Sequence, residues 1–401
     1  MVTGSSCMAA EHKPSTFDED VAFLKKHTDV VVLKNNGRQV AVVPQYQGRV
    51  MTSTTSAGSG ASFGWLNYKV IEKGLLSDKE KVGKLEDHIY VFGGEERFWL
   101  GPEGGQFSIF FKPGDPFEFA KWKTPAAIDT HPYKVVGQTK DSIVFTHDCE
   151  LLNHSGTTLS VGIKRTVRLV SEAEVSKMLK MPLPSGIEFV AYESDNVVIN
   201  KGNKAWTKQT GMLSIWILGM YKPSPETVVV IPFVSGPVKD LGPRVNDAYF
   251  GKVPSDYIRV EKDKVFFKGD GTRRGKIGIS PERSMGIAGS YDTAGKTLTL
   301  VTYNVPDKHQ GYVNSMWELQ KNPFDGDALN AYNDGSPGPG LKPLGPFYEL
   351  ETSSPAAALA TNESMRHVQR TIHITGPEKQ LNDIAKTMLH VSLKEIKEAF
   401  K

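Results

Sequence analysis

The stretch DVVVLKNNGRQVAVVPQY, residues 29–46, carries a strong hairpin signal. Two runs rich in β-branched residues flank Asn36-Gly37, a dipeptide that favours a two-residue turn between antiparallel strands. Similar runs recur at 142–153, 159–170 and 297–305, and Gly-containing turn signals separate them. Because helices do not alternate with these runs, we predict a mainly β fold of antiparallel sheets packed face to face, not a doubly wound α/β fold.

Helical patterns lie at the two ends of this β-rich region. Ser15-Thr16 and the acidic residues after them predict a capping box and a short helix over 17–27. Residues 378–400 place apolar side chains on one helical stripe, and Val391-Ser392 resembles a cap between two short helices. We therefore predict a disordered tail over 1–14, a β domain over 15–376 that includes the first helix, and a helical segment over 377–401 packed on that domain.

Composition and charge exclude several classes of protein. The formal net charge is only +3 and Lys and Arg form no dense stripe, so we predict no nucleic-acid partner. Since no run of 18 apolar residues exists, we predict no transmembrane segment. The small residues Gly4-Ser5-Ser6 before Cys7 resemble the end of a bacterial lipoprotein signal. This pattern predicts a lipid anchor at Cys7 and a periplasmic or cell-envelope location, with a plain tail residue and a cytoplasmic location as alternatives.

Four stretches combine aromatic, acidic and basic residues with Gly or Pro at their edges, which is the composition of a sugar-binding cleft. In the first, 93–111, Arg97 and Trp99 share one face of a predicted strand, and Glu103 follows in a turn after Gly101-Pro102. We predict that these three side chains bind the sugar. The structural alternative is an Arg–Glu ion pair beside a core Trp.

The second and third stretches each offer one main candidate. In the second, 124–133, His131 lies next to Pro132 and close to Asp129, so it is a candidate general acid or sugar ligand, although a lone His is more often structural. In the third, 212–221, Trp216 is a candidate platform on which a sugar ring could stack. A buried core strand explains the third stretch equally well.

The fourth stretch, 311–359, is the richest. Trp317 lies near its start, and residues 325–334 form an oxygen-rich loop. That loop resembles a Ca²⁺ loop in composition but not in spacing, so we favour turn formation over Ca²⁺ and predict no metal site and no required cofactor. Further on, Glu349 and Glu351 share one strand face; their repulsion raises the pKa of at least one and makes a general base available. Arg97 or Lys276 would neutralise them.

Leu350-Glu351-Thr352, together with Asn362-Glu363-Ser364 and the strand over 369–374, resembles the end of aldose 1-epimerases. Over residues 17–400 the chain also resembles an uncharacterised branch of secreted bacterial proteins in the galactose mutarotase-like superfamily. The motifs that carry this resemblance are GGEERFWLGPEGGQFSIFFKPG, WKTPAAIDT, SIWILGMYKPSP, SMGIAGSYD, DGDALNAYNDG and GPFYELETSSPA. The resemblance implies a galactose mutarotase-like β-supersandwich and a sugar as the small-molecule partner.

The same resemblance implies a mechanism. In epimerases the Glu of the Leu-Glu-Thr strand takes the proton from the anomeric hydroxyl, and a His protonates the ring oxygen. The Glu corresponds to Glu351. The strand that carries the family's His is replaced here by SIWILGMY, which has none. His131, His373 and Glu103 are therefore the candidate acids.

These observations predict a carbohydrate-recognising protein which, if it is an enzyme, is an aldose 1-epimerase-like isomerase. One alternative is a non-catalytic glycan-binding or accessory protein of the cell envelope. Another is a polysaccharide lyase or hydrolase, because the same sandwich hosts such chemistry in other families. The predicted catalytic residues are Glu351 and His131. The predicted substrate-binding residues are Arg97, Trp99, Glu103, Trp216, Lys276, Trp317, Glu349 and His373.

Overall fold

The computed structural model of the chain describes residues 15–58, 60–306, 310–338 and 340–401. The tail predicted over 1–14 and Cys7 within it lie outside these residues. The lipid anchor and the cell-envelope location therefore stay predictions.

The hairpin expected at Asn36-Gly37 is confirmed. Strand β1 (Val31–Asn35) pairs antiparallel with β2 (Arg38–Val43), and β3 (Arg49–Thr54) completes a three-stranded sheet in the order β1-β2-β3. Asn36 has φ 48° and Gly37 has φ 84°, the left-handed conformation that this turn requires. Helix α1 (Phe17–His27) packs against β3 and begins at the predicted capping box, which joins Thr16 to Glu19.

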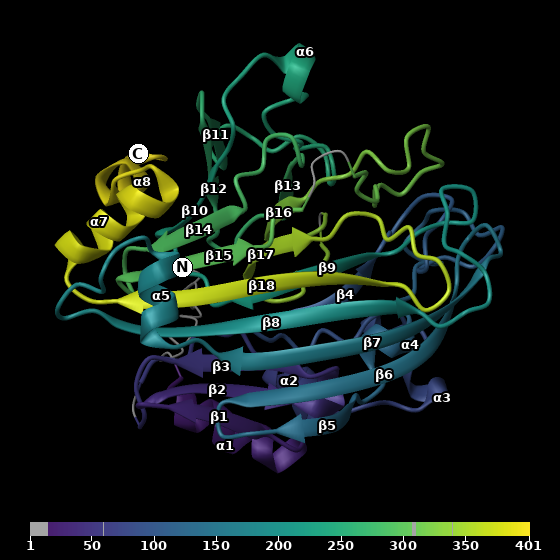
Figure 1. Cartoon of the computed structure of the whole chain (residues 1–401), viewed down its shortest axis with the longest axis horizontal. Coiled ribbons are helices and arrows are strands. Elements are labelled where there is room, and N and C mark those ends of the chain that lie inside the picture. The colour runs from purple at the N-terminus through teal and green to yellow at the C-terminus, as the bar shows by residue number, and fades with distance from the viewer. Residues whose placement is uncertain (1–14, 59, 307–309, 339) are drawn as a thin grey trace, which may run out of the picture.

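A ten-stranded antiparallel sheet forms the largest layer, and its long strands β18, β8, β7 and β6 run side by side in Figure 1. The strand order is β11-β12-β10-β14-β15-β18-β8-β7-β6-β5. The bounds are β5 Lys134–Gln138, β6 Ser142–Leu152, β7 Thr158–Leu169, β8 Glu188–Asn200, β10 Thr227–Pro232, β11 Ile258–Val260, β12 Lys264–Lys268, β14 Ile287–Asp292, β15 Thr297–Tyr303 and β18 Ser364–Thr375.

A five-stranded antiparallel sheet packs against this layer and positions the candidate site. Its order is β13-β16-β17-β9-β4, with bounds β4 Arg97–Gly101, β9 Ser214–Tyr221, β13 Gly275–Ile279, β16 Leu329–Asn333 and β17 Tyr348–Ser353. Along each strand, alternate residues such as Ile277, Ala331 and Leu350 lie in a core cluster shared with β10, β12 and β15 of the large sheet. The residues between them face the opposite side. The predicted architecture of antiparallel sheets packed face to face is confirmed.

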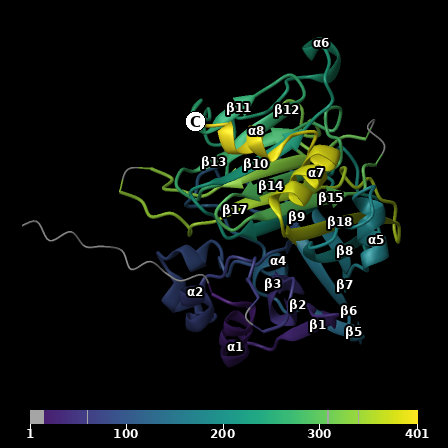
Figure 2. The same ribbon diagram turned by 90° about the vertical axis from the view of Figure 1, so that its left-hand side faces the viewer.

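Helices α7 and α8 pack on one face of the ten-stranded sheet, where their apolar side chains share a core cluster with its strands. The bounds of the helices after α1 are α2 Tyr68–Lys73, α3 Asp78–Lys81, α4 Ala126–Asp129, α5 Glu172–Met178, α6 Val238–Leu241, α7 Glu378–Leu389 and α8 Leu393–Glu398, with short 3-10 turns at Pro44–Tyr46 and Leu85–Asp87. The predicted division near Ser392 is confirmed, because Ser392 is the N-cap of α8. Helix α7 contacts β10 and β14 and α8 contacts β10, as the two views show (Figures 1 and 2). Within the described ranges, no helix has both the length and the apolar character needed to cross a membrane.

Candidate functional site: a cleft on the outer face of the five-stranded sheet

Strand alternation directs a polar and aromatic set of side chains to the outer face of the five-stranded sheet. On β17 this set includes Glu349 and Glu351, which lie opposite Tyr332 and Asn330 of β16. The side chains between them, such as Leu350, belong to the buried core. The prediction that the two glutamates share one strand face therefore agrees with the observed register.

A cavity of about 860 Å³ lies over this outer face. Segments that are distant in the sequence form its walls: the loop after β4, the turn before β16, and the loops before β13 and β17. Many of the lining residues are aromatic or charged, and they include Glu103, Phe119, Trp122, Trp216, Tyr249, Phe250, Arg274, Lys276, Trp317, Asp327, Asn330, Tyr332 and Asp334.

Glu351 lies beneath this cavity and is almost fully buried, with 1% of its surface exposed. Its Oε2 accepts a hydrogen bond from the Trp216 indole Nε1 at 2.9 Å and one from the Lys276 ammonium Nζ at 2.7 Å. The ammonium group also lies 4.4 Å from the Trp216 ring centroid. Among the described residues, the buried Oε1 has no hydrogen-bond partner. A buried carboxylate oxygen without a partner is costly, and Glu95 Oε2 is another such atom among the described residues.

Glu349 is the second carboxyl group on the same strand face. Burial raises its pKa well above the ordinary value, and the negative charge of Glu351 raises the pKa further. Lys276 and Arg97 act in the opposite direction but more weakly. Glu349 therefore favours the protonated form. Of the two cations that the sequence offered to neutralise the glutamates, Arg97 and Lys276, it is Lys276 that pairs with Glu351.

Glu103 reaches the cavity from the loop after β4. Its Oε1 accepts a hydrogen bond from Trp317 Nε1 at 3.0 Å, and its backbone N–H donates to Ser315 Oγ at 3.1 Å. The two loops approach closely because Gly104 has no side chain; a Cβ there would lie 2.2 Å from the backbone oxygen of Met316. Burial raises the pKa of Glu103. The structure thus brings together two predicted residues, Glu103 and Trp317, that are 214 positions apart.

The opposite side of the cavity contains a hydrogen-bonded group that the sequence did not single out as a site. Asp327 Oδ2 accepts hydrogen bonds from Tyr249 Oη at 2.7 Å and from Asn246 Nδ2 at 2.9 Å. Burial raises the pKa of Asp327. Gly278 makes room for this carboxylate, because a Cβ at that position would lie 2.0 Å from Asp327 Oδ2.

Arg97 and Trp99 are buried at the β4 edge and are not among the cavity-lining residues. The Arg97 guanidinium pairs with Asp129 at 2.8 Å and lies 3.9 Å from the Trp99 ring centroid. Both partners of the ion pair are almost fully buried. Arg97 therefore has a structural partner in Asp129, and Trp99 packs behind the cavity wall against Phe110, with ring centroids 5.2 Å apart.

The structure does not bring the two predicted histidines to the cavity. His131 is exposed just before the edge strand β5, with its ring 5.8 Å from that of His147. His373 is buried between the sheets, where its Nε2 lies 2.7 Å from Glu95 Oε1 and its Nδ1 lies 2.9 Å from Thr299 Oγ1. Neither position offers a route to a ligand over Glu351, so neither residue can act there as the acid.

The oxygen-rich segment over 325–334 was predicted as a loop, but it contains strand β16 (Leu329–Asn333), and its side chains bind other protein groups. Asn333 accepts from the backbone N–H of Gly271 at 2.7 Å and donates to Asp270 Oδ1 at 2.9 Å. Asp334 accepts from Tyr332 Oη at 2.9 Å and from the backbone N–H of Gly345 at 2.8 Å. The contacts to Asp270, Gly271 and Gly345 tie the end of β16 to other loops, which differs from the local turn formation that the sequence favoured. In the part of the chain that the structure describes, no group of three or more His, Cys, Asp or Glu side chains is arranged to hold a metal ion.

Several cavity residues were missed by sequence reasoning because their partners are distant in the chain. Trp122 stacks on Trp317 with ring centroids 5.9 Å apart, and Arg274 lies 3.7 Å from the Phe250 ring centroid. A usable signal existed for Arg274, which precedes Lys276 by two positions and so shares its strand face. No local pattern marks Trp122 or Phe250.

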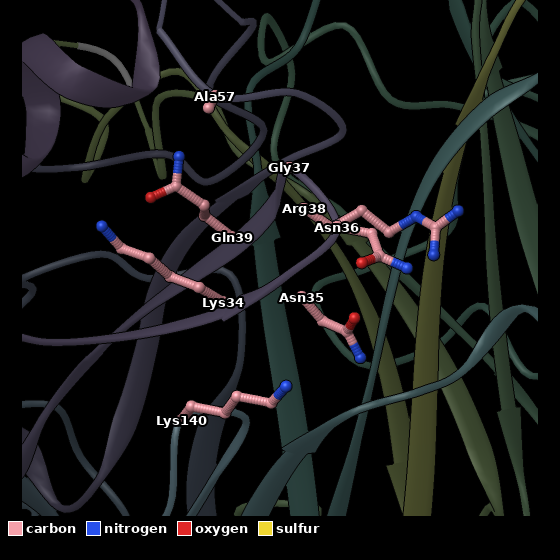
Figure 3. Close-up of a pocket in the computed structure, with 8 residues that line it drawn as sticks. All are labelled: Lys34, Asn35, Asn36, Gly37, Arg38, Gln39, Ala57 and Lys140. Atoms are coloured by element: carbon pink, nitrogen blue, oxygen red, sulfur yellow. The ribbon is translucent and has the colours of Figure 1, made fainter.

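A second, smaller hollow of about 300 Å³ lies beside the β1–β2 hairpin and includes Lys34, Arg38 and Lys140. Figure 3 shows that the side chains of Lys34 and Arg38 extend to opposite sides. Arg38 contacts Glu172 at 3.3 Å. Because these cations do not converge, the hollow is not a built anion site.

Comparison with known proteins places the chain in context. The model of a family of unknown function, DUF6786, matches residues 15–400. None of the curated proteins compared with the chain matches it. The Slr1438 protein from Synechocystis sp. PCC 6803 is 12% identical with a TM-score of 0.50, and the match covers 87% of this chain and 96% of that protein.

Two further solved structures are similar at lower TM-scores. A putative aldose 1-epimerase from Escherichia coli K12 is 10% identical with a TM-score of 0.48, over 87% of this chain and 99% of that one. A galactose mutarotase-like protein from Lactobacillus casei ATCC 334 is 10% identical with a TM-score of 0.46, over 86% of this chain and 100% of that one. At these identities the similarity is one of fold. The match to the Slr1438 protein thus shows a similarity of fold alone.

Proposed function

We infer that this chain, which belongs to a family of unknown function (DUF6786), binds a carbohydrate in the cleft on the outer face of the five-stranded sheet. The observation that carries this inference is the aromatic-walled and charged cavity of about 860 Å³, whose lining residues Trp216 and Lys276 both hydrogen-bond the Glu351 carboxylate beneath it. A sugar fits this combination of groups. Its hydroxyl groups donate hydrogen bonds to a carboxylate, and its C–H faces pack on rings such as Trp216.

The finer proposal is an isomerase that acts at the anomeric centre. The Glu351 carboxylate would turn toward the cavity and accept the proton of the anomeric hydroxyl. The bond between the anomeric carbon and the ring oxygen then breaks, a carbonyl forms at the anomeric carbon, and the ring oxygen takes a proton from a general acid. Rotation about the adjacent carbon–carbon bond and the reverse of these steps close the ring on the other face and return both protons.

Glu103 is the acid that the geometry supports best. It lines the same cavity as Trp216 and Lys276, the two residues that hold Glu351. Because burial raises its pKa, Glu103 favours the protonated form more than an exposed glutamate does. Glu349 also has a raised pKa, but neither it nor Glu351 is among the cavity-lining residues, whereas Glu103 is. Trp317 fixes the Glu103 carboxyl through Oε1 and leaves Oε2 for the ligand.

The alternative function is non-catalytic glycan binding. One observation favours it: none of the cavity-lining residues in the described ranges is a histidine. A binding protein needs the polar groups and the aromatic walls of the cavity, but it needs no acid. The two functions therefore share the ligand and the site and differ only in proton transfer.

The test combines ligand binding with anomer exchange. Calorimetric titration with a panel of aldoses, uronates and their oligosaccharides measures binding, and magnetisation-transfer NMR on the same sugars measures exchange between anomers. We expect Glu351→Gln to weaken binding, because the amide presents a different hydrogen-bonding edge. If the chain catalyses anomer exchange, the same substitution should abolish the exchange, because an amide accepts no proton. Glu150→Gln is the matched control, because Glu150 is exposed on strand β6 of the ten-stranded sheet and does not line the cavity.

The outcomes separate the two functions. Exchange that falls in both Glu351→Gln and Glu103→Gln supports the isomerase. Binding without accelerated exchange supports the binding protein. If no sugar in the panel binds, or if Glu351→Gln binds as the unmodified chain does, the carbohydrate proposal is wrong.

A further inference from the structure

We propose that the ligand of this cleft is an oligosaccharide that lies across strands β13, β16, β17 and β9, with one sugar ring beside Glu351 and further rings toward both edges of the sheet. This inference rests on the proposed carbohydrate function and names the ligand class more narrowly. It follows from the width of the cleft floor, from aromatic residues at its two opposite sides, and from apolar side chains exposed at its rim.

The floor is too wide for one sugar ring. The sheet residues that line the cavity lie on β13, β16, β17 and β9, and these four strands make three interstrand intervals of about 4.8 Å, so the floor extends roughly 14 Å. A pyranose ring is comparable in width with one such interval. The cavity volume of about 860 Å³ is also in the upper part of the range of roughly 300–1,000 Å³ found for drug-sized ligands, which are much larger than a single hexose.

Aromatic residues lie at both ends of this floor. At the β4 side, Phe119, Trp122 and Trp317 form a row with successive ring centroids 6.0 Å and 5.9 Å apart. At the β13 side, the Phe250 ring lies 6.0 Å from that of Tyr332 of β16 and is covered by the Arg274 guanidinium. A single ring held over Glu351, on the middle strand β17, reaches neither end.

The rim exposes apolar side chains to solvent. Phe119 is 53% exposed, Phe250 is 45% exposed and Leu341 is 61% exposed, and all three line the same cavity from three different loops. Exposed apolar side chains around a cavity mark a binding site when polar residues lie beside them. Here Glu318 and Lys342 lie at the same rim, so the covering group must offer hydroxyls as well as apolar faces. Sugar rings have both, whereas an aryl or alkyl group has only the apolar part.

The test is a chain-length series. Titration calorimetry with glucose, galactose, mannose and xylose, and with their linear di-, tri- and tetrasaccharides, gives Kd as a function of length. We expect Kd to fall by about tenfold from the monosaccharide to the trisaccharide of the recognised series, which corresponds to about 1.4 kcal/mol. The ratio of the two Kd values should approach one in Phe119→Ala and in Phe250→Ala.

The variants are chosen so that failure is informative. Both phenylalanines are half-exposed, so their truncation should leave the unfolding midpoint close to that of the unmodified chain; circular dichroism checks this. Leu152→Ala, at the exposed end of β6, is the matched control and should keep the full dependence on length.

A Kd that is independent of length, or an aryl glycoside that binds more tightly than the trisaccharide, overturns the oligosaccharide inference and leaves the proposed carbohydrate function standing. If no member of the series binds at any length, both are overturned. Shortened products during the titration would support the oligosaccharide as ligand and add cleavage to the function.

Discussion

The ion pair between Lys276 and Glu351 should dominate the energetics of the cleft floor. The Nζ–Oε2 distance is 2.7 Å, and the side chains are only 9% and 1% exposed. Lys276→Met removes the ammonium but keeps a stem of similar length, so Glu351 remains buried with Trp216 as its one hydrogen-bond donor among the described residues. Removal of one partner of a buried pair costs about 3–5 kcal/mol. Because Lys276 borders the cavity, where water can replace part of the lost interaction, we expect the lower end, about 3 kcal/mol.

A double-mutant cycle shows whether this cost comes from the pair. In Lys276→Met/Glu351→Gln both charges are absent and the Gln oxygen can still accept from Trp216 Nε1. The free energy of unfolding of the double variant should therefore lie within about 1 kcal/mol of that of the unmodified chain, with a coupling energy of about 2 kcal/mol or more. Lys252→Met is the matched control, because its pair with Asp247 spans 3.8 Å and Lys252 is 87% exposed. It should cost less than about 0.5 kcal/mol.

Equilibrium urea unfolding at neutral pH, followed by tryptophan fluorescence and far-ultraviolet circular dichroism, measures these differences from the transition midpoints. A cost below about 1 kcal/mol for Lys276→Met would refute the reasoning. So would a double variant that is no more stable than Lys276→Met alone, because the loss would then come from packing and not from an unpaired carboxylate.

Two other predictions concern the cavity wall. Burial raises the pKa of Asp334 to about 6, so the protonated form stabilises the fold; this contribution is fully present below the unfolded pKa of about 3.9 and is lost as the pH rises through about 6. The free energy of unfolding of Asp334→Asn minus that of the unmodified chain should therefore increase by about 2 kcal/mol between pH 4 and pH 7, and a difference that stays constant in urea titrations contradicts this. Gly278→Ala should displace Asp327 from Tyr249 and cost about 1–3 kcal/mol, because the new Cβ would lie 2.0 Å from the carboxylate oxygen. In the double variant Gly278→Ala/Tyr249→Phe the loss of stability should be less than the sum of the two single losses, because both changes remove the same hydrogen bond; strictly additive losses would show that Gly278 does not protect that bond. Gly137→Ala is the control: its Cβ would meet only ordinary van der Waals contacts, so its urea midpoint should stay nearly unchanged.

Local sequence patterns predicted the elements whose causes are local. Asn36-Gly37 supplies two left-handed residues, and Thr16 with Glu19 closes a capping box within one helical turn. The position of Glu349 and Glu351 on the same strand face was also predictable, because side-chain direction alternates along any strand. These features depend on neighbours a few positions away, which the sequence displays directly.

The partners of the site residues were not predictable in the same way. Arg97 finds Asp129 on the short helix α4, and Glu103 meets Trp317 across 214 positions. His373 is held between the sheets by Glu95, which is 278 positions away. Such contacts depend on strand order and loop path, and a strand pattern specifies neither.

The sequence by itself determined that this chain is built from antiparallel strands, that helices flank them, and that two carboxylates share one strand face, because turn chemistry and side-chain alternation act over a few residues. Only the tertiary structure decided that Lys276 and Trp216 hold Glu351 at the floor of a cleft, and that His131 and His373 stay away from it. The physical reason is that the strand order β13-β16-β17-β9-β4 brings together side chains from five separate parts of the chain, and burial on that shared surface sets their charges and partners.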